Sequence, residues 1–164
     1  MKCKLVTWVI AVMLLPVAGA LSAAPKQKPV YDNTELRLRF EWPTPGSIHV
    51  ARGDHDITLE GSVGGIDVKL VVRPGERIPE TQHQFRLMSY FAGAWEKDDA
   101  ECRGTGWDGC ASWHFASESG KTKGVAEVGF GPGGTYMLVL TSSAGSFQER
   151  RPKMRTLEQS VVLY

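Results

Sequence analysis

The chain has 164 residues, of which 42% are hydrophobic and 23% are charged, and its formal net charge at pH 7 is +1. A near-neutral chain offers no basic patch of the kind that nucleic acid requires, so nucleic-acid binding is not expected. The length fits one domain with a substantial core and is too short for two ordinary domains.

Residues 1–20 have the pattern of a secretory signal peptide. An uncharged apolar run from 5 to 15 follows two lysines and precedes a stretch of small residues, in the order typical of such signals. The run is shorter than the roughly 20 residues that span a bilayer, so we expect no transmembrane segment after cleavage. Ala18 and Ala20 form an A-x-A site that predicts cleavage after Ala20, with cleavage after Ala23 as a second possibility. The alternative to a cleaved signal is an uncleaved N-terminal anchor.

Removal of the signal changes the cysteine count and the charge. It removes Cys3 and two lysines, which leaves Cys102 and Cys110 as the remaining cysteines and lowers the net charge by two, from +1 to −1. An exported chain reaches a compartment in which disulfides persist. We therefore expect a periplasmic or secreted protein with a Cys102–Cys110 disulfide.

The first part of the mature chain predicts a leader followed by strands. Residues 21–33 contain two prolines and few apolar residues, which predicts a flexible leader before a single domain over 34–164. The stretch "TELRLRFEW" alternates apolar and charged residues, as in a strand with one buried face. "SIHVA" and "DITLE" are short strand candidates, and "GIDVKLVV" follows the glycine-rich "GSVGG", which predicts a β-hairpin.

The stretch "TQHQFRLMSYFAGAW", residues 81–95, predicts a central helix. Thr81 followed by Gln84 fits a capping box at the start of a helix. So broad an apolar stripe is expected to pack against a sheet, and "EKDDAE" after it is expected to be a solvated helix end. The stripe consists of Phe85, Met88, Ala92 and Trp95, widened by Leu87, Phe91 and Ala94.

The rest of the chain predicts three more strands and a second helix. "CASWHFASES", "GVAEVGF" and "TYMLVLTSS" have strand patterns, and "GPGG" joins the last two. Met154, Leu157 and Val161 lie at helical spacing, with Pro152 expected in the first helical turn. Strands joined by tight turns, with helices packed on them, predict an α+β domain with a mostly antiparallel sheet.

This order of elements resembles the PsbP-like α+β fold, a family that includes DcrB-type envelope proteins. The resemblance lies in the aromatic-proline strand "FEWPTPG", the hairpin and the central helix, and in "TYMLVLTSS" followed by the helical "SFQERRPKMRTLEQSV". It implies a central helix and a C-terminal helix packed on the sheet. It also implies an accessory or protein-binding role without a shared catalytic site. No cofactor is expected. The disulfide loop is not part of this pattern.

The loop between the cysteines, "RGTGWDG", consists largely of turn-forming residues around one tryptophan. A disulfide would restrict the loop and hold the indole with little freedom to lose on binding. Because tryptophan is enriched among residues that dominate interfaces, one hypothesis is that Trp107, Arg103 and Asp108 contact a partner. The alternative is that Trp107 folds back onto the protein's own core and the disulfide merely staples a long connection.

One group of polar residues contains candidate metal ligands. His49, Asp54, His55 and Asp56 are weak candidate ligands for a divalent metal. Their spacing matches no metal signature, and turn chemistry accounts for the aspartates, so no metal is expected.

A hydrolase is a further alternative. It would use His114, with Ser112 and Ser117 nearby, or the carboxylates of the acidic run. No G-x-S-x-G elbow occurs, and a solvated surface is the other interpretation of the acidic run, so an enzyme is not expected. The acidic run consists of Glu96, Asp98, Asp99 and Glu101.

The sequence as a whole predicts an exported, non-enzymatic domain that binds another exported or envelope protein. The narrower hypothesis is an inhibitor or immunity-type protein that covers the active site of its partner. The competing hypothesis, which follows from the PsbP-like resemblance, is an accessory or assembly factor of an envelope or secretion complex.

Overall fold

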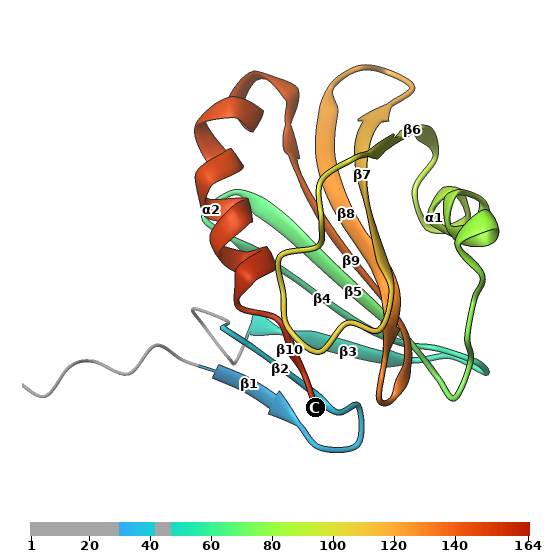
Figure 1. Ribbon diagram of the computed structural model, residues 1–164. Coiled ribbons are helices and arrows are strands. Elements are labelled where there is room, and N and C mark those ends of the chain that lie inside the picture. The colour runs from blue at the N-terminus through green and yellow to red at the C-terminus, as the bar shows by residue number, and fades with distance from the viewer. Residues whose placement is uncertain (1–29, 42–46) are drawn as a thin grey trace, which may run out of the picture.

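The computed structural model describes residues 30–41 and 47–164, and the expected signal peptide and its cleavage sites lie outside these ranges. The described residues form an α+β fold in which helices pack on a mostly antiparallel sheet (Figure 1). The fold class predicted from the sequence is therefore confirmed.

A seven-stranded sheet forms the centre of the fold. In spatial order its strands are β3 (His49–Arg52), β4 (Ile57–Val63), β5 (Ile66–Pro74), β9 (Gly134–Ser143), β8 (Thr122–Gly131), β7 (Cys110–Ser117) and β6 (Gly93–Asp98). Neighbouring strands in this sheet are antiparallel. The hairpins predicted around "GSVGG" and "GPGG" are present as β4–β5 and β8–β9. The pairing of β5 with β9 joins the two halves of the sheet.

A three-stranded sheet lies beside the large one. It consists of β1 (Val30–Asn33), β2 (Leu38–Glu41) and β10 (Val162–Leu163). β1 lies in the segment expected to be a flexible leader, so that expectation is wrong for these residues, which pair with β2. The strand expected from residue 34 begins at Leu38, because residues 34–37 form a turn. Asn33 Oδ1 accepts a hydrogen bond from the Leu36 amide at 3.0 Å and stabilises this turn.

The central helix is shorter than the sequence predicts. α1 spans His83–Tyr90 after a single 3-10 turn, and β6 follows, so the helix predicted over 81–95 is wrong beyond residue 90. The expected capping box is also absent, because the N-cap residue is Gln82 and its side chain makes no capping bond. β6 and β7 pack closely enough that a Cβ at Gly93 would lie 2.5 Å from the Ala116 carbonyl oxygen. The acidic run therefore begins inside a strand and is not a helix end.

The C-terminal helix, α2, spans Phe147–Gln159 and also follows a 3-10 turn. Met154 and Leu157 are buried as predicted. Pro152 lies inside α2 and not in its first turn, which removes one helical hydrogen bond. The proline is on the exposed side of the helix, where water can satisfy the freed carbonyl group.

The two faces of the large sheet bury separate apolar clusters. One face, called the α2 face, buries Leu138 and Leu140 together with Met154 of α2 and residues of the small sheet. The opposite face, called the α1 face, buries Val139 and several aromatic side chains together with Leu87 of α1. Side chains alternate between the faces along each strand, as strand geometry requires. Figure 1 shows α2 and α1 on opposite sides of the sheet.

Candidate functional site

The α2 face becomes polar along β6, β7 and β8. Asp98, Ser112 and Glu127 are cross-strand neighbours in one row, and Glu96 and His114 occupy the next row. Side chains in cross-strand register share one face of the sheet. The pairing therefore brings together polar residues from three separate strands.

Two carboxylates are buried in this region between the sheet and α2. Glu127 and Glu158 are only 2% and 3% exposed. The Arg103 amide donates a hydrogen bond to Glu127 Oε1 at 2.6 Å. The Glu158 carboxylate lies 3.2 Å from Arg103 Nε and accepts a bond from Arg151 Nη1 at 2.8 Å. We call Arg103, Glu127, Arg151 and Glu158 the buried carboxylate cluster.

Glu127 is the most perturbed member of this cluster. Burial raises the pKa of Glu127 to about 7, with a contribution from nearby Glu158, while the Arg103 amide opposes the rise. Within the described part of the chain, Glu127 Oε2 has no hydrogen-bond partner. It borders a small cavity of about 10 Å³ that Asp98 and Ser112 also line, which is about the space of one water molecule. A carboxyl group with a pKa near neutrality in such a place is typical of functional sites.

Sequence reasoning missed Glu127 and Glu158 as site residues. The available signal was a single carboxylate inside the apolar stretch "GVAEVGF", since buried strands seldom carry an acidic residue without a partner. Glu158 gave a weaker signal because acidic residues are common on helix surfaces.

His114 and Asp98, both singled out from the sequence, are brought together. His114 Nε2 lies 2.9 Å from Asp98 Oδ2, and the His114 side chain is about half exposed. Although burial opposes the change, the Ala100 amide and His114 lower the pKa of Asp98. Of the other acidic-run residues, Glu96 is the cross-strand partner of His114, and Asp99 and Glu101 are exposed.

The candidate serines are engaged with other groups. The Ser112 hydroxyl donates to Cys102 Sγ at 3.9 Å. Ser117 Oγ accepts a hydrogen bond from the Thr122 amide at 3.0 Å. Neither contact involves His114. This geometry therefore does not test the hydrolase hypothesis.

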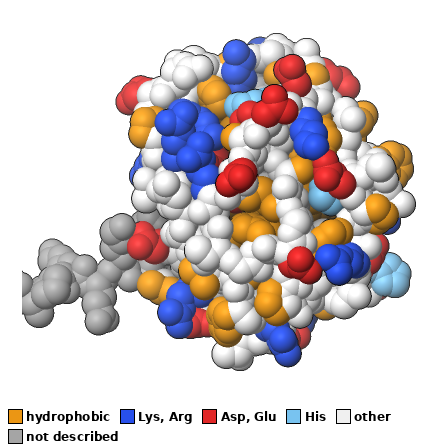
Figure 2. Space-filling view, viewed as in Figure 1, with side chains coloured by type: hydrophobic (Ala, Val, Ile, Leu, Met, Phe, Trp, Pro, Cys, Tyr) orange, Lys and Arg blue, Asp and Glu red, His pale blue; other side chains and the backbone are white. Residues whose placement is uncertain are grey.

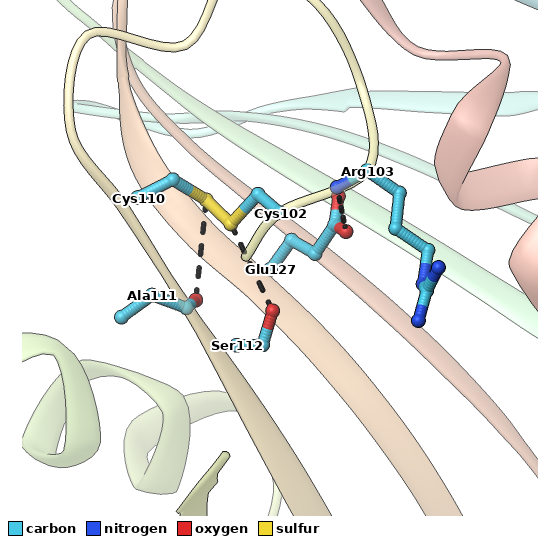
Figure 3. The surroundings of a disulfide bond; sticks show 6 residues. All are labelled: Cys102, Arg103, Cys110, Ala111, Ser112 and Glu127. Carbon is cyan, nitrogen blue, oxygen red and sulfur yellow. Dashed lines mark hydrogen bonds between the residues drawn. A yellow bond between two sulfur atoms is a disulfide. The ribbon is translucent and has the colours of Figure 1, made fainter. Parts of the chain in front are cut away.

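The predicted Cys102–Cys110 disulfide is present, with a Cα–Cα distance of 6.0 Å (Figure 3). The loop that it closes is also bound to its surroundings by backbone hydrogen bonds. The Thr105 amide donates to the Val161 carbonyl at 2.8 Å and the Leu163 amide to the Thr105 carbonyl at 2.9 Å. Further along, the Asp108 amide donates to the Phe130 carbonyl at 2.8 Å. The loop is therefore docked on β8 and on the C-terminal segment.

The three residues proposed for partner contact point in different directions. Trp107 packs against the cluster of the α2 face, with its ring centroid 6.2 Å from that of Tyr136. This is the geometry of the second alternative, in which the indole folds back onto the core. Arg103 belongs to the buried carboxylate cluster, and exposed Asp108 pairs with Arg77 at 3.0 Å. Contact of these residues with a partner stays a prediction.

The weak metal candidates lie on and after β3. Asp56 accepts a hydrogen bond from the Tyr90 hydroxyl at 2.6 Å, and burial together with this bond raises the pKa of Tyr90 to about 12. His49, Asp54 and His55 are exposed. Over residues 30–41 and 47–164, no group of three or more His, Cys, Asp or Glu side chains is close enough to hold a metal ion.

α1 presents a second candidate surface. Phe85 and Met88 are 71% and 51% exposed, so this part of the apolar stripe expected to face the sheet points into solvent. The helix buries Leu87, as expected, together with His83. Gln84 fixes this orientation by donating a hydrogen bond to the Trp95 carbonyl at 3.2 Å. We call Phe85 and Met88 the α1 apolar surface; Figure 2 shows hydrophobic side chains at the right edge, over the position of α1.

The antiparallel sheet, the central helix and the C-terminal helix form a PsbP-like α+β fold. The chain is similar to cyanobacterial PsbP (CyanoP) from Synechocystis sp. PCC 6803, whose solution structure matches 89% of this chain and 100% of that chain, with a TM-score of 0.50 and 14% sequence identity. At this identity the match concerns the fold, and it confirms the predicted resemblance. No family model and no curated protein sequence matches the chain.

Within the described ranges, each helix falls short of the length and apolar composition of a membrane span.

Proposed function

We propose that the chain is an exported protein-binding domain and that the α1 apolar surface contacts its partner. The exposure of Phe85 and Met88, 71% and 51%, is the observation that carries this proposal. Large apolar side chains that a protein does not bury in its own core are typical of interaction sites when they lie together. The bond from Gln84 to β6 keeps the helix in one orientation, so little order would have to be gained on binding.

Two features support export. Residues 1–20 have the pattern of a signal peptide, and the folded chain contains a disulfide, which persists in oxidising compartments such as the periplasm. The partner is therefore another exported or envelope-located protein.

The narrower form of the proposal is an inhibitor or immunity-type protein that covers the active site of its partner. A short helix with two projecting apolar side chains fits a concave surface, and enzyme active sites are concave and largely apolar. The second candidate is an accessory or assembly factor of an envelope or secretion complex. The PsbP-like fold favours it, because the sequence resemblance to that family implies an accessory role.

The test compares capture of partners from the native envelope by three forms of the protein. These are the wild type, a Phe85→Ser/Met88→Ser double variant, and a Val50→Ser control on β3, where Val50 is 43% exposed. We expect the wild type and the control to retain the same partner and the double variant to lose it, as measured by mass spectrometry. Equal capture by all three forms would contradict a contact through α1.

The captured partner then separates the two candidates. An inhibitor or immunity-type protein forms a one-to-one complex with an enzyme and abolishes its activity. An accessory factor instead co-purifies with a large assembly, which size-exclusion chromatography distinguishes from a one-to-one complex.

A further inference from the structure

The disulfide loop keeps its position through contacts that do not involve the sulfur atoms. Thr105 is bound on both sides, through its amide to Val161 and through its carbonyl to Leu163. The Phe130 amide donates to the Gly109 carbonyl at 3.0 Å, which fixes the loop next to Cys110. Trp107 adds packing against the core. The bridge can therefore open and close while the loop that carries it stays in place, and reversible exchange requires this property.

The two sulfur atoms have different surroundings (Figure 3). Cys102 Sγ accepts a hydrogen bond from the Ser112 hydroxyl at 3.9 Å. Cys110 Sγ lies 4.0 Å from the carbonyl oxygen of Ala111, which is an acceptor. A hydroxyl donor stabilises a thiolate, whereas a carbonyl oxygen does not. Cys102 is therefore the better leaving group of the pair, since a stabilised thiolate leaves faster.

Glu127 is connected to this bridge through Ser112 and Arg103. It is the cross-strand partner of Ser112, and its Oε1 accepts the amide that follows Cys102 in the chain. Its other oxygen has no partner among the described residues. The buried carboxylate cluster thus holds a carboxyl group at the residue that follows Cys102.

We propose that Cys102–Cys110 is a thiol–disulfide exchange site that oxidises an external dithiol, with Cys102 as the leaving thiolate and Glu127 as its proton donor. Both cysteines are partly exposed, which the approach of a small dithiol to Cys110 requires. This inference is independent of the surface proposed for partner binding.

A thiolate of the dithiol bonds to Cys110 Sγ, the Cys102–Cys110 bond breaks, and its electron pair remains on Cys102 Sγ. The Cys102 thiolate takes the proton of the Glu127 carboxyl group, which recovers a proton from water. The second thiolate of the dithiol then attacks its own sulfur in the mixed disulfide and releases Cys110, which is protonated by solvent. The dithiol becomes a disulfide, and the protein gains two electrons and two protons.

The groups around Glu127 allow it to serve in this way near neutral pH. Arg103 from the loop, Glu158 and Arg151 from α2, and Asp98 from β6 face it or line the same cavity. Burial is the largest influence and raises its pKa to about 7. A group whose pKa lies near the working pH is the most effective proton donor.

The first experiment measures whether the folded protein exchanges at all. The purified protein is equilibrated with mixtures of reduced and oxidised dithiothreitol, free thiols are alkylated and counted by mass spectrometry, and near-UV circular dichroism follows the fold. We expect a reversible change of two thiols with the tertiary signal retained. Reduction only under denaturing conditions, or loss of the tertiary signal on reduction, would overturn the proposal and leave a structural bridge.

The second experiment tests the role of Glu127. The rate of reduction by dithiothreitol is measured from pH 6 to 9 for E127Q and for the control E101Q, which alters an exposed carboxylate next to Cys102, each relative to wild type. We expect E127Q to be roughly tenfold slower or more below pH 7, with the deficit shrinking at higher pH, and E101Q to match wild type. Equal profiles for E127Q and E101Q would exclude Glu127 as the proton donor.

A third variant keeps the proposal testable where E127Q does not fold. S112A removes the hydroxyl that donates to Cys102 Sγ and leaves the carboxylates unchanged. We expect slower reduction of S112A at every pH, whereas an unchanged rate would exclude Cys102 as the stabilised leaving group.

Discussion

The two faces of the large sheet are covered to different degrees. On the α2 face, a 13-residue helix and the small sheet bury a long apolar cluster. On the α1 face, the helix has eight residues and buries only His83 and Leu87. The aromatic rings of Trp95 and Phe115 there cover each other, with centroids 4.7 Å apart. An apolar stripe in a helix is thus buried only where the fold supplies a surface for it, and otherwise becomes a surface for something else.

The largest expected effect comes from comparing a methionine on each face. Met154 of α2 is fully buried, whereas Met88 of α1 is 51% exposed. Met154→Ala is expected to lower the free energy of unfolding by about 3–4 kcal/mol, because it leaves a cavity in the core. Urea unfolding of Met154→Ala and of Met88→Ala measures the contrast. Similar losses in the two variants would mean that Met88 is also packed against the core.

The next effect concerns Trp107 of the disulfide loop, which packs on the α2 face. Trp107→Ala removes an indole that packs against the core and Tyr136. We expect a loss of about 2–3 kcal/mol, less than for a fully buried tryptophan, because the ring is partly exposed. Thermal unfolding followed by circular dichroism measures it. An unchanged melting temperature combined with loss of a bound partner would instead favour the interface hypothesis.

An effect of comparable size, which develops only as the pH rises, concerns the polar end of the α2 face. Because burial raises the pKa of Glu127 from 4.5 to about 7, its contribution to stability is fully present below the unfolded pKa and is lost as pH rises through 7. Glu127→Gln cannot ionise. Its free energy of unfolding relative to wild type is therefore expected to rise by about 3 kcal/mol between pH 4 and pH 8, measured by denaturant titration. A constant difference across this range would mean that Glu127 is solvated.

The smallest expected effect belongs to the α1 apolar surface. Phe85→Ser and Met88→Ser change exposed side chains, so each is expected to alter the free energy of unfolding by no more than about 0.5 kcal/mol. Denaturant unfolding with the Val50→Ser control checks this. A large loss for the α1 variants alone would assign these residues a role in the fold.

Local signals in the sequence predicted the strands and hairpins well. Gly64 and Gly65 join β4 to β5 with φ values of 56° and 74°, and such a turn is readable from two glycines between strand patterns. The disulfide followed from the loss of Cys3 with the expected signal. Each of these predictions depended on neighbours in the chain or on counting.

Features fixed by distant contacts were not predictable. The helix α1 stops where it does because β6 pairs with β7 across the disulfide loop, although "SYFAGAW" continues the apolar stripe. Glu127 and Glu158 come from different elements and share Arg103 only after the loop has docked. The direction of Trp107 likewise depends on Tyr136, a residue of β9. Sequence spacing does not encode any of these contacts.

The junction between β5 and β9 has a consequence for how the chain reaches its native state. It sets Pro74 opposite Gly134 and Asp67 opposite Thr141, whereas the other neighbouring strands in the large sheet are consecutive along the chain. The meanders β3–β5 and β6–β9 can each form from nearby segments, but joining them closes a long loop at an entropic cost. Refolding is therefore expected to be limited by the meeting of two preformed meanders, with amides of the β5–β9 ladder the last to gain protection in pulsed hydrogen exchange.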